Sequence, residues 1–214
     1  MSRTNAAYKC RAMTAEKYLE LERTAKDKHE FIAGEIVAMA GASDNHNVIS
    51  SSVFGELWTH LKKTKCRIFA ADMCVRAKKG NCFYPDLLVT CGERKFEDEK
   101  KKDVLLNPKV IFEVLSKPTK LKDRNEKFES YIRLESLTDY VLTEQDKMKV
   151  EHYSRLDEKD WKVRICAEAI GRFFLNQSTA AFQSPMFIRK FRFRRTHRNR
   201  LTLMLFKIRF NANQ

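Results

Sequence analysis

The segment VIFEVL, residues 110–115, constrains the fold of this chain more than any other. It is apolar except for one glutamate, and such a run is typical of a strand that is covered on both faces in a mixed or parallel sheet. Because side chains alternate along a strand, Ile111, Glu113 and Leu115 should share one face. The run therefore predicts a central strand that carries one carboxylate into apolar surroundings.

Helical and strand-like periodicities alternate on both sides of this strand. In chain order they predict a helix over about 14–25, a strand pair over 29–41 turning at Ala33-Gly34, a helix over 43–63, strands at 66–80 and 82–92 joined by a turn at 78–81, the strand at 107–119, a helix over 122–136, and a strand pair over 138–156. This order indicates an α/β or α+β domain built around one sheet.

Composition narrows the class of protein. The hydrophobic fraction is 43% and the charged fraction 33% of 214 residues, which is typical of a soluble globular chain with one domain and an appendage at most. No stretch approaches the roughly 18 apolar residues that a membrane span needs. The first twelve residues lack the apolar core of a secretory signal. We therefore expect a cytoplasmic protein that does not contact a membrane.

Six cysteines stand at positions 10, 66, 74, 82, 91 and 166. None forms a CxxC pair, and no paired histidine spacing accompanies them, which argues against a zinc site. A chain of this length does not need disulfides for its stability. We expect the cysteines to be reduced thiols, several of them on strands.

The net charge of +14 is unevenly distributed. Ten basic residues and no acidic residue lie in 170–214, so 14 − 10 leaves +4 for the first 169 residues. The last 45 residues also hold eight of the fifteen Phe. We expect an N-terminal extension (1–12), a domain (13–165) and a basic Phe/Arg-rich tail (166–214). A shifted reading frame or a gene-end rearrangement explains this tail better than a DNA-binding arm does.

Two carboxylates could carry chemistry. A buried Glu113 costs several kcal/mol unless a partner compensates it, and either a divalent cation or a Lys or Arg could do so. Asp86 follows Pro85, which fixes the chain as it enters LLVTC. Pro-Asp is also a common turn dipeptide. Strands lie about 4.8 Å apart, so carboxylates on neighbouring strands can reach one cation.

The order and spacing of several motifs resemble a known family. HEFIAGEIVAMAGAS, YPDLLVTCG, LLNPKVIFEVLSKPT, DRNEKFESYIRLESLTDYVLTEQD and KVEHYSR, spread over about 14–155, are similar to the Uma-two restriction endonuclease family. That family is part of the PD-(D/E)xK nuclease superfamily. The resemblance implies a restriction-endonuclease-like core, a mixed central sheet flanked by helices with an extra N-terminal strand pair, and metal-assisted hydrolysis of phosphodiester bonds.

The resemblance also implies the site residues. Asp86 matches the Asp of the PD motif and Glu113 the acid of the second motif, and both would bind Mg²⁺ or Mn²⁺ with the backbone carbonyl of Val114 as a further ligand. Leu115 occupies the position of the motif's Lys. The family supplies this Lys from the following helix, where Lys127 matches; its alternative reading is a solvent-facing helix cation. Glu30 is expected to be a third acid.

Four other polar residues are weaker candidates. His46 matches a characteristic family position and could be a ligand or a substrate contact, although a helix-end or packing role is slightly favoured. Glu35 and Asp72 are expected to be ordinary strand or turn residues. Ser116 could hydrogen-bond locally or near the metal.

The leading hypothesis is a DNA endonuclease that acts as a homodimer, without a small-molecule cofactor. A dimer is expected because one such site serves one strand. The first alternative is a non-catalytic or degenerate copy that only binds nucleic acid, which the atypical C-terminus favours. The second is a metal-dependent hydrolase of another substrate, because a metal site does not name its substrate.

Overall fold

The VIFEVL run forms strand β8 (Val110–Leu115), inside a six-stranded sheet. The sheet order is β11 (Trp161–Cys166), β10 (Val150–Arg155), β9 (Asp139–Glu144), β8, β6 (Leu87–Cys91) and β3 (Cys66–Ala70). β8 pairs parallel with β9 and antiparallel with β6, so the sheet is mixed. The predicted strand pair over 138–156 is β9 and β10.

The computed structural model describes residues 13–116, 119–147, 149–166, 171–174, 187–195 and 201–205. Besides the six strands above, its main domain contains α1 (Ala15–Glu22), β1 (His29–Ile32), β2 (Glu35–Ala38), α2 (Asp44–Leu61), β4 (Cys74–Arg76), η1 (Lys78–Gly80), β5 (Cys82–Phe83), β7 (Val104–Leu105), α3 (Lys120–Lys122), η2 (Asp123–Lys127) and α4 (Phe128–Tyr131).

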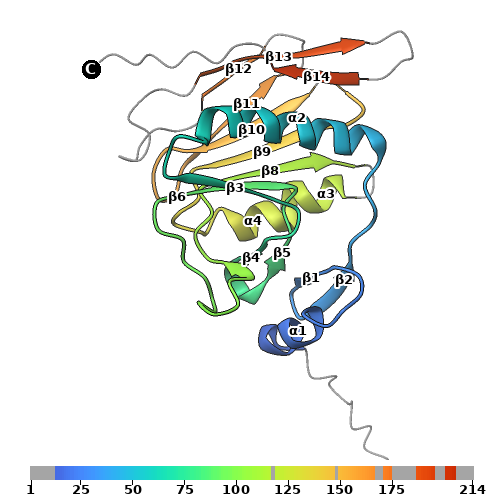
Figure 1. Ribbon diagram of the computed structural model, residues 1–214, viewed down its shortest axis with the longest axis vertical. Coiled ribbons are helices and arrows are strands. Elements are labelled where there is room, and N and C mark those ends of the chain that lie inside the picture. Colours follow the sequence, from blue (N-terminus) through green and yellow to red (C-terminus); the bar gives the residue numbers. More distant parts are fainter. Residues whose placement is uncertain are drawn as a thin grey trace, which may run out of the picture.

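Helices cover both faces of the large sheet (Figure 1). One buried cluster joins α2 to the face of β8 that carries Val110, Phe112 and Val114. The other buried cluster joins α4 to the face that carries Ile111 and Leu115. The predicted mixed central sheet flanked by helices is therefore confirmed. Glu113, which alternates with Ile111 and Leu115, lies on the α4 side.

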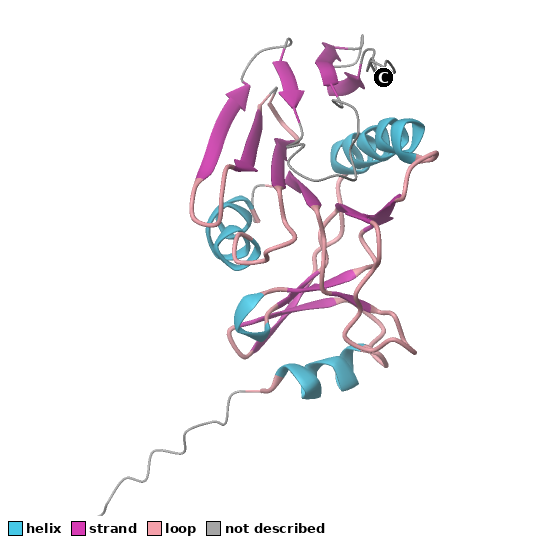
Figure 2. Cartoon of the chain, turned by 90° about the vertical axis from the view of Figure 1, so that its left-hand side faces the viewer, coloured by secondary structure: helices cyan, strands magenta, loops and turns pink. Residues whose placement is uncertain are grey.

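The prediction of one sheet is wrong, because a smaller five-stranded sheet lies beneath the large one. Its order is β2-β1-β5-β4-β7, and Figure 2 shows it between the large sheet and α1. The strands predicted at 66–80 and 82–92 form a single bent hairpin. Its distal half, β4 with β5, joins the small sheet, and its proximal half, β3 with β6, joins the large sheet. One bend, at 84–86, contains Pro85, which has no N–H for a strand ladder.

Both predicted turns are confirmed. Ala33 and Gly34 have φ values of 50° and 94° and connect β1 to β2, the extra N-terminal strand pair. Two consecutive positive φ values match the twist of a two-residue hairpin. At the tip of the bent hairpin, Lys79 and Gly80 have φ values of 63° and 79°. Glycine supplies that conformation without steric cost, which explains its place in the turn.

Two predicted helices differ in extent. α1 ends at Glu22 and not near residue 25. The helix predicted over 122–136 starts at Lys120, ends at Tyr131, and contains a π-helical turn, η2, at 123–127. Leu134 is buried although the helix has already ended, so its spacing from Tyr131 imitates helical periodicity while it packs after a turn.

The prediction of reduced cysteines is wrong for one pair. Cys66 and Cys91 face each other in the register of β3 and β6 and form a disulfide. Cys74 and Cys82 are free and buried. The register pairs positions 25 residues apart, a relationship that cysteine spacing alone does not reveal. Cys10 and the side chain of Cys166 fall outside the described part of the chain.

The predicted extension, 1–12, lies outside the described residues, as does most of the predicted tail, 166–214. Within that tail, β12 (Gly171–Phe174), β13 (Phe187–Arg195) and β14 (Leu201–Leu205) form an antiparallel three-stranded sheet. β14 lies beside α2 (Figure 1). Across the described ranges, no helix is long and apolar enough to span a bilayer.

Candidate active site

Glu113 enters the site from the middle of β8. Its neighbours in the strand are apolar, and only 4% of the residue is exposed. The sheet register forces this burial, because every second residue of β8 on that face packs beneath α4. A carboxylate in this position needs a compensating charge or cation.

Asp86 lies at the bend of the hairpin, immediately before β6. The Val114 N–H donates a 2.6 Å hydrogen bond to Asp86 Oδ2. The Asp86 N–H is 3.4 Å from Glu113 Oε2, which accepts from it. The structure thus brings together the two carboxylates that the strand pattern selects, because β6 and β8 are adjacent strands.

Lys127 supplies the positive charge of the site from the end of the π turn. Its ammonium lies 3.2 Å from Glu113 Oε1, 2.9 Å from Glu30 Oε1 and 3.2 Å from Asp123 Oδ1. The residue is 6% exposed, so the alternative reading of a solvent-facing helix cation is wrong. Lys127 also lies over the Phe83 ring, 5.8 Å from its centroid.

Glu30 reaches this cluster from β1, in the small sheet. It is 4% exposed and accepts a 2.6 Å hydrogen bond from Lys122 Nζ at its second oxygen, Oε2. Sequence reasoning missed Lys122 and Asp123. Both stand on the same helical segment as Lys127: Asp123 is the first residue of the π turn, and Lys122 immediately precedes it. The DRNEKF motif, residues 123–128, includes Asp123 but not Lys122.

Burial and mutual charge determine the protonation of the cluster. Burial raises the pKa of Glu113 far above its usual range, and the carboxylates of Asp123, Asp86 and Glu30 raise it further against the opposing charge of Lys127. Burial alone would lower the pKa of Lys127, but Glu113, Glu30 and Asp123 raise it well above the usual value. Lys127 is therefore a charged ammonium at neutral pH.

Glu30 carries the matching negative charge. Burial would raise its pKa, but the charges and hydrogen bonds of Lys127 and Lys122 lower it overall. Glu30 is therefore ionised at neutral pH. The Glu30–Lys127 pair is an ion pair in a low-dielectric environment, and it holds the ammonium beside Glu113.

Comparison with known proteins shows which family the chain belongs to. A model of the Uma2 family, described as "Putative restriction endonuclease", matches residues 15–182. The "Uncharacterized protein sll1609" of Synechocystis is 38% identical over 150 residues, which cover 70% of this chain and 84% of that protein. A second Synechocystis protein, slr1290, is 34% identical over 152 residues, 71% of this chain and 78% of that protein. The chain belongs to the Uma2 family.

A solved structure extends the comparison to the fold. The chain is similar to the crystal structure of "a putative nuclease belonging to DUF820" from Anabaena variabilis, with a TM-score of 0.63 and 17% sequence identity. The superposed region covers 75% of this chain and 88% of that protein's chain. Similarity at this level concerns the fold, and it confirms the restriction-endonuclease-like core. The Uma2 resemblance of the sequence motifs is confirmed as well.

The donor set of this Uma2 chain fits a hard divalent cation. Asp86 and Glu113 offer two carboxylates, and Mg²⁺ is usually bound by one or two carboxylates together with water. No group of three or more His, Cys, Asp or Glu side chains that could hold a metal occurs among the described residues. Glu30 Oε1 and Asp123 Oδ1 are buried without a hydrogen-bond partner, but both lie within ion-pair distance of Lys127. Glu30, Asp123 and Glu113 Oε1 therefore hold the ammonium together, and the other oxygens of the Asp86–Glu113 pair are those that could bind a metal.

Of the four weaker candidates, only His46 contacts the site. His46 Nε2 lies 3.0 Å from Asp86 Oδ2, so this first-turn residue of α2 contacts the site. Ser116 hydrogen-bonds locally, with its hydroxyl 2.9 Å from that of Thr119. Glu35 is exposed on the edge strand β2, and Asp72 is an exposed turn residue that pairs with Lys28. Glu35 and Asp72 lie outside the cluster.

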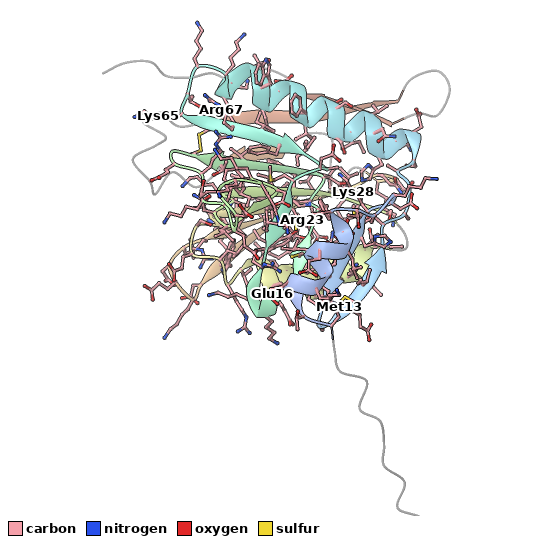
Figure 3. The ribbon with its side chains drawn as sticks, turned by 60° about the horizontal axis from the view of Figure 1, so that its bottom comes forward. Met13, Glu16, Arg23, Lys28, Lys65 and Arg67 are labelled. Atoms are coloured by element: carbon pink, nitrogen blue, oxygen red, sulfur yellow. A yellow bond between two sulfur atoms is a disulfide. The ribbon has the colours of Figure 1, made fainter. Side chains whose placement is uncertain are left out.

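The cations near the site come from the helical segment and not from β3. Ala70, at one end of β3, pairs with Leu87 beside Asp86, whereas Cys66 at the other end pairs with Cys91. Lys65 and Arg67 therefore lie at the end of β3 that is remote from Asp86. Figure 3 shows both of them far from Lys28, the residue that precedes β1. Lys127, which contacts Glu113, and Lys122, which contacts Glu30, are therefore the lysines that the structure brings to this cluster.

Proposed function

We propose that this Uma2 protein is a metal-dependent endonuclease that hydrolyses DNA phosphodiester bonds. The observation that carries the proposal is the buried Lys127 ammonium beside the Asp86–Glu113 carboxylate pair. The Lys127 ammonium has more acidic neighbours than one positive charge balances, because Glu30, Glu113 and Asp123 all lie within 3.2 Å of it, and such an excess of carboxylates favours a further cation. Metal-assisted attack on a phosphodiester requires these charges.

Asp86 and Glu113 would bind Mg²⁺ or Mn²⁺, with the Val114 carbonyl as a further oxygen ligand. When bound, the metal would lower the pKa of a coordinated water and neutralise charge on the scissile phosphate. Val114 and His46 orient the Asp86 carboxylate, because the N–H of Val114 and Nε2 of His46 both contact Oδ2. Glu113 is held from the other side by Lys127.

Lys127 has a narrower role than sequence reasoning allowed. A lysine in this position could either orient the attacking water or stabilise the pentavalent phosphate. Its ion pairs with Glu30, Glu113 and Asp123 favour the charged ammonium over a neutral amine that would accept a proton. Its ammonium would instead stabilise the negative charge that develops on phosphate oxygens in the transition state.

DNA as the substrate and a homodimer as the active form belong to the same proposal. One carboxylate pair serves one phosphodiester, so cutting both strands calls for two copies of the site. A dimer would present two Asp86–Glu113 pairs to one duplex. Mixing an inactive variant with wild-type protein tests this, because mixed dimers would nick DNA without linearising it.

The test is plasmid cleavage with purified full-length protein. With Mg²⁺ or Mn²⁺ the wild type should convert supercoiled plasmid to nicked and linear forms, and EDTA should abolish this. Asp86→Ala should reduce the rate about 100-fold or more, because it removes a ligand of the metal. Asp72→Asn is the matched control, because the Asp72 side chain is 92% exposed and lies outside the cluster.

Each alternative function has its own result in this experiment. If neither wild type nor variant cuts DNA but all of them slow its migration in a gel equally, the protein binds nucleic acid without catalysing its hydrolysis. If neither cleavage nor binding occurs while Mn²⁺ binds in an Asp86-dependent manner, a hydrolase with another substrate replaces it. Equal cutting by wild type and Asp86→Ala would contradict the assignment of the site.

A further inference from the structure

The helical segment that carries Lys127 is not a regular α-helix. It runs from Lys120 to Tyr131, and residues 123–127 form a π turn in which the hydrogen-bonded repeat is five residues and not four. Asp123 and Lys127, the first and last residues of that turn, are both buried. The π turn therefore decides where the Lys127 ammonium lies relative to Glu113.

A tyrosine in the sheet binds the backbone of this turn. The Tyr140 hydroxyl donates a 2.9 Å hydrogen bond to the carbonyl oxygen of Asp123. Tyr140 belongs to β9, is fully buried, and is the register partner of Ile111 on β8. The hydrogen bond thus connects the strand next to that of Glu113 with the first residue of the π turn.

Two aromatic rings of α4 pack against Tyr140. Its ring lies 5.6 Å from the Tyr131 ring and 5.8 Å from the Phe128 ring, centroid to centroid. Both neighbours belong to α4, immediately after Lys127. Packing therefore holds the helix after the π turn, and the hydroxyl holds the backbone at its start.

We propose that Tyr140 is a positioning residue for Lys127, acting through its hydrogen bond to the Asp123 carbonyl. The bond fixes the π turn against the sheet, and the turn holds the ammonium at ion-pair distance from Glu30 and Glu113. The Tyr140 hydroxyl binds the Asp123 carbonyl and makes no hydrogen bond to Asp86, Glu113 or Lys127, so Tyr140 is not proposed as a catalytic residue. The effect on cleavage rests on the proposed nuclease function, but the effect on the position of Lys127 does not.

A neighbouring tyrosine provides the control. Tyr153 belongs to the same aromatic cluster, with its ring centroid 6.1 Å from that of Tyr140. Its hydroxyl donates to Glu151 Oε2 at 3.1 Å, an atom that also accepts from the Arg124 side chain, and it makes no hydrogen bond to the backbone of the π turn. Tyr140→Phe and Tyr153→Phe each remove one hydroxyl and keep the ring, so they differ in whether the lost bond reaches Asp123.

The first measurement is independent of activity. The acetylation rate of Lys127 and the hydrogen exchange of residues 123–128 are followed by mass spectrometry in wild type and both variants. We expect Tyr140→Phe to raise the acetylation rate about fivefold and to speed exchange in the turn, because a local hydrogen bond controls local opening. Tyr153→Phe should change neither. Wild-type values in Tyr140→Phe, or equal changes in both variants, would overturn the proposal.

The second measurement is plasmid cleavage at saturating Mg²⁺. Tyr140→Phe should lower kcat about tenfold and leave KM within about twofold, because a displaced ammonium stabilises the transition state less while DNA binding is unchanged. A purely structural role would lower only the melting temperature. If wild type does not cut, the labelling result still decides the positioning role, and the failure belongs to the proposed function.

Discussion

The Lys127 ammonium lies 3.2 Å from Glu113 Oε1 although Lys127 comes from a helix fourteen residues further along the chain. In the superfamily pattern that the chain resembles, the lysine stands two residues after the acid, where this chain has Leu115. That position is buried beneath α4 and contributes to the core. The helix therefore supplies the positive charge, and Leu115 on the strand packs in the core.

Replacing Lys127 with Met should affect both stability and cleavage. The change leaves Asp123 and Glu113 buried without their cation and leaves Glu30 with Lys122 alone. Removing one partner of a buried ion pair costs about 3–5 kcal/mol. Cleavage should fall about 100-fold, because stabilisation of the transition state is lost. Urea unfolding and plasmid cleavage measure the two effects.

Lys122→Met is the matched control for this variant. Lys122 also binds Glu30, but its side chain is 22% exposed, and no contact of Lys122 with Glu113 is observed. Its loss should therefore cost less stability and much less activity than the loss of Lys127. Equal losses of activity in the two variants would show that Lys127 has no special position.

Glu151 should make the stability depend on pH in the acid range. Burial alone would raise the pKa of Glu151, but Arg124 and Lys149 outweigh burial and lower it from 4.5 to about 2. The folded pKa lies below the unfolded one, so ionised Glu151 stabilises the fold above about pH 4.5, and this contribution is lost as the pH falls toward 2. Glu151→Gln should lower the free energy of unfolding by about 2 kcal/mol at pH 7.

The difference between wild type and Glu151→Gln is the decisive quantity, because it cancels the titration of other carboxylates. Urea unfolding at a series of pH values should show the difference shrinking from pH 4.5 to pH 2. A difference that stays constant over this range would mean that the ion pairs with Arg124 and Lys149 do not lower the pKa of Glu151.

The disulfide should stabilise the large sheet. Closing a loop of this length, with a separation of 25 residues, corresponds to about 3 kcal/mol in the chain-entropy model. Dithiothreitol should therefore lower the melting temperature of wild type, and a peptide map without reductant should contain Cys66 joined to Cys91. The melting temperature of the double variant Cys66→Ser/Cys91→Ser should not change with dithiothreitol. If it falls as much as that of wild type, the effect comes from other cysteines.

Tyr131→Phe should leave stability unchanged or raise it by up to about 1 kcal/mol. The Tyr131 hydroxyl is buried and has no hydrogen-bond partner, and an unsatisfied buried polar group destabilises a fold. Thermal unfolding measures the difference. A loss of more than about 1 kcal/mol would indicate a water-mediated hydrogen bond that the hydroxyl makes in solution.

Sequence reasoning reached the carboxylate pair from the residues alone, because alternation in β8 and the proline before Asp86 are local signals. It reached Lys127 and Glu30 only through family resemblance. Asp123 was not predicted because a π turn has no simple sequence signature, and Lys122 was not predicted because it stands outside the DRNEKF motif. The disulfide was not predicted because the register of β3 against β6 depends on the whole hairpin. The second sheet was not predicted because, in the sequence, the bent hairpin looks like an uninterrupted pair of strands.

The bent hairpin has a consequence for how this protein can vary in length. Asp86 sits where one chain passes from the small sheet to the large one, so the three residues 84–86 act as a fixed spacer between β5 and β6. One inserted residue there would rotate the carboxylate to the opposite face of the sheet. Lengthening the distal turn at 78–81 would leave that spacer untouched. Natural insertions and engineered tags should therefore be tolerated at the tip of the hairpin and rejected at its bend.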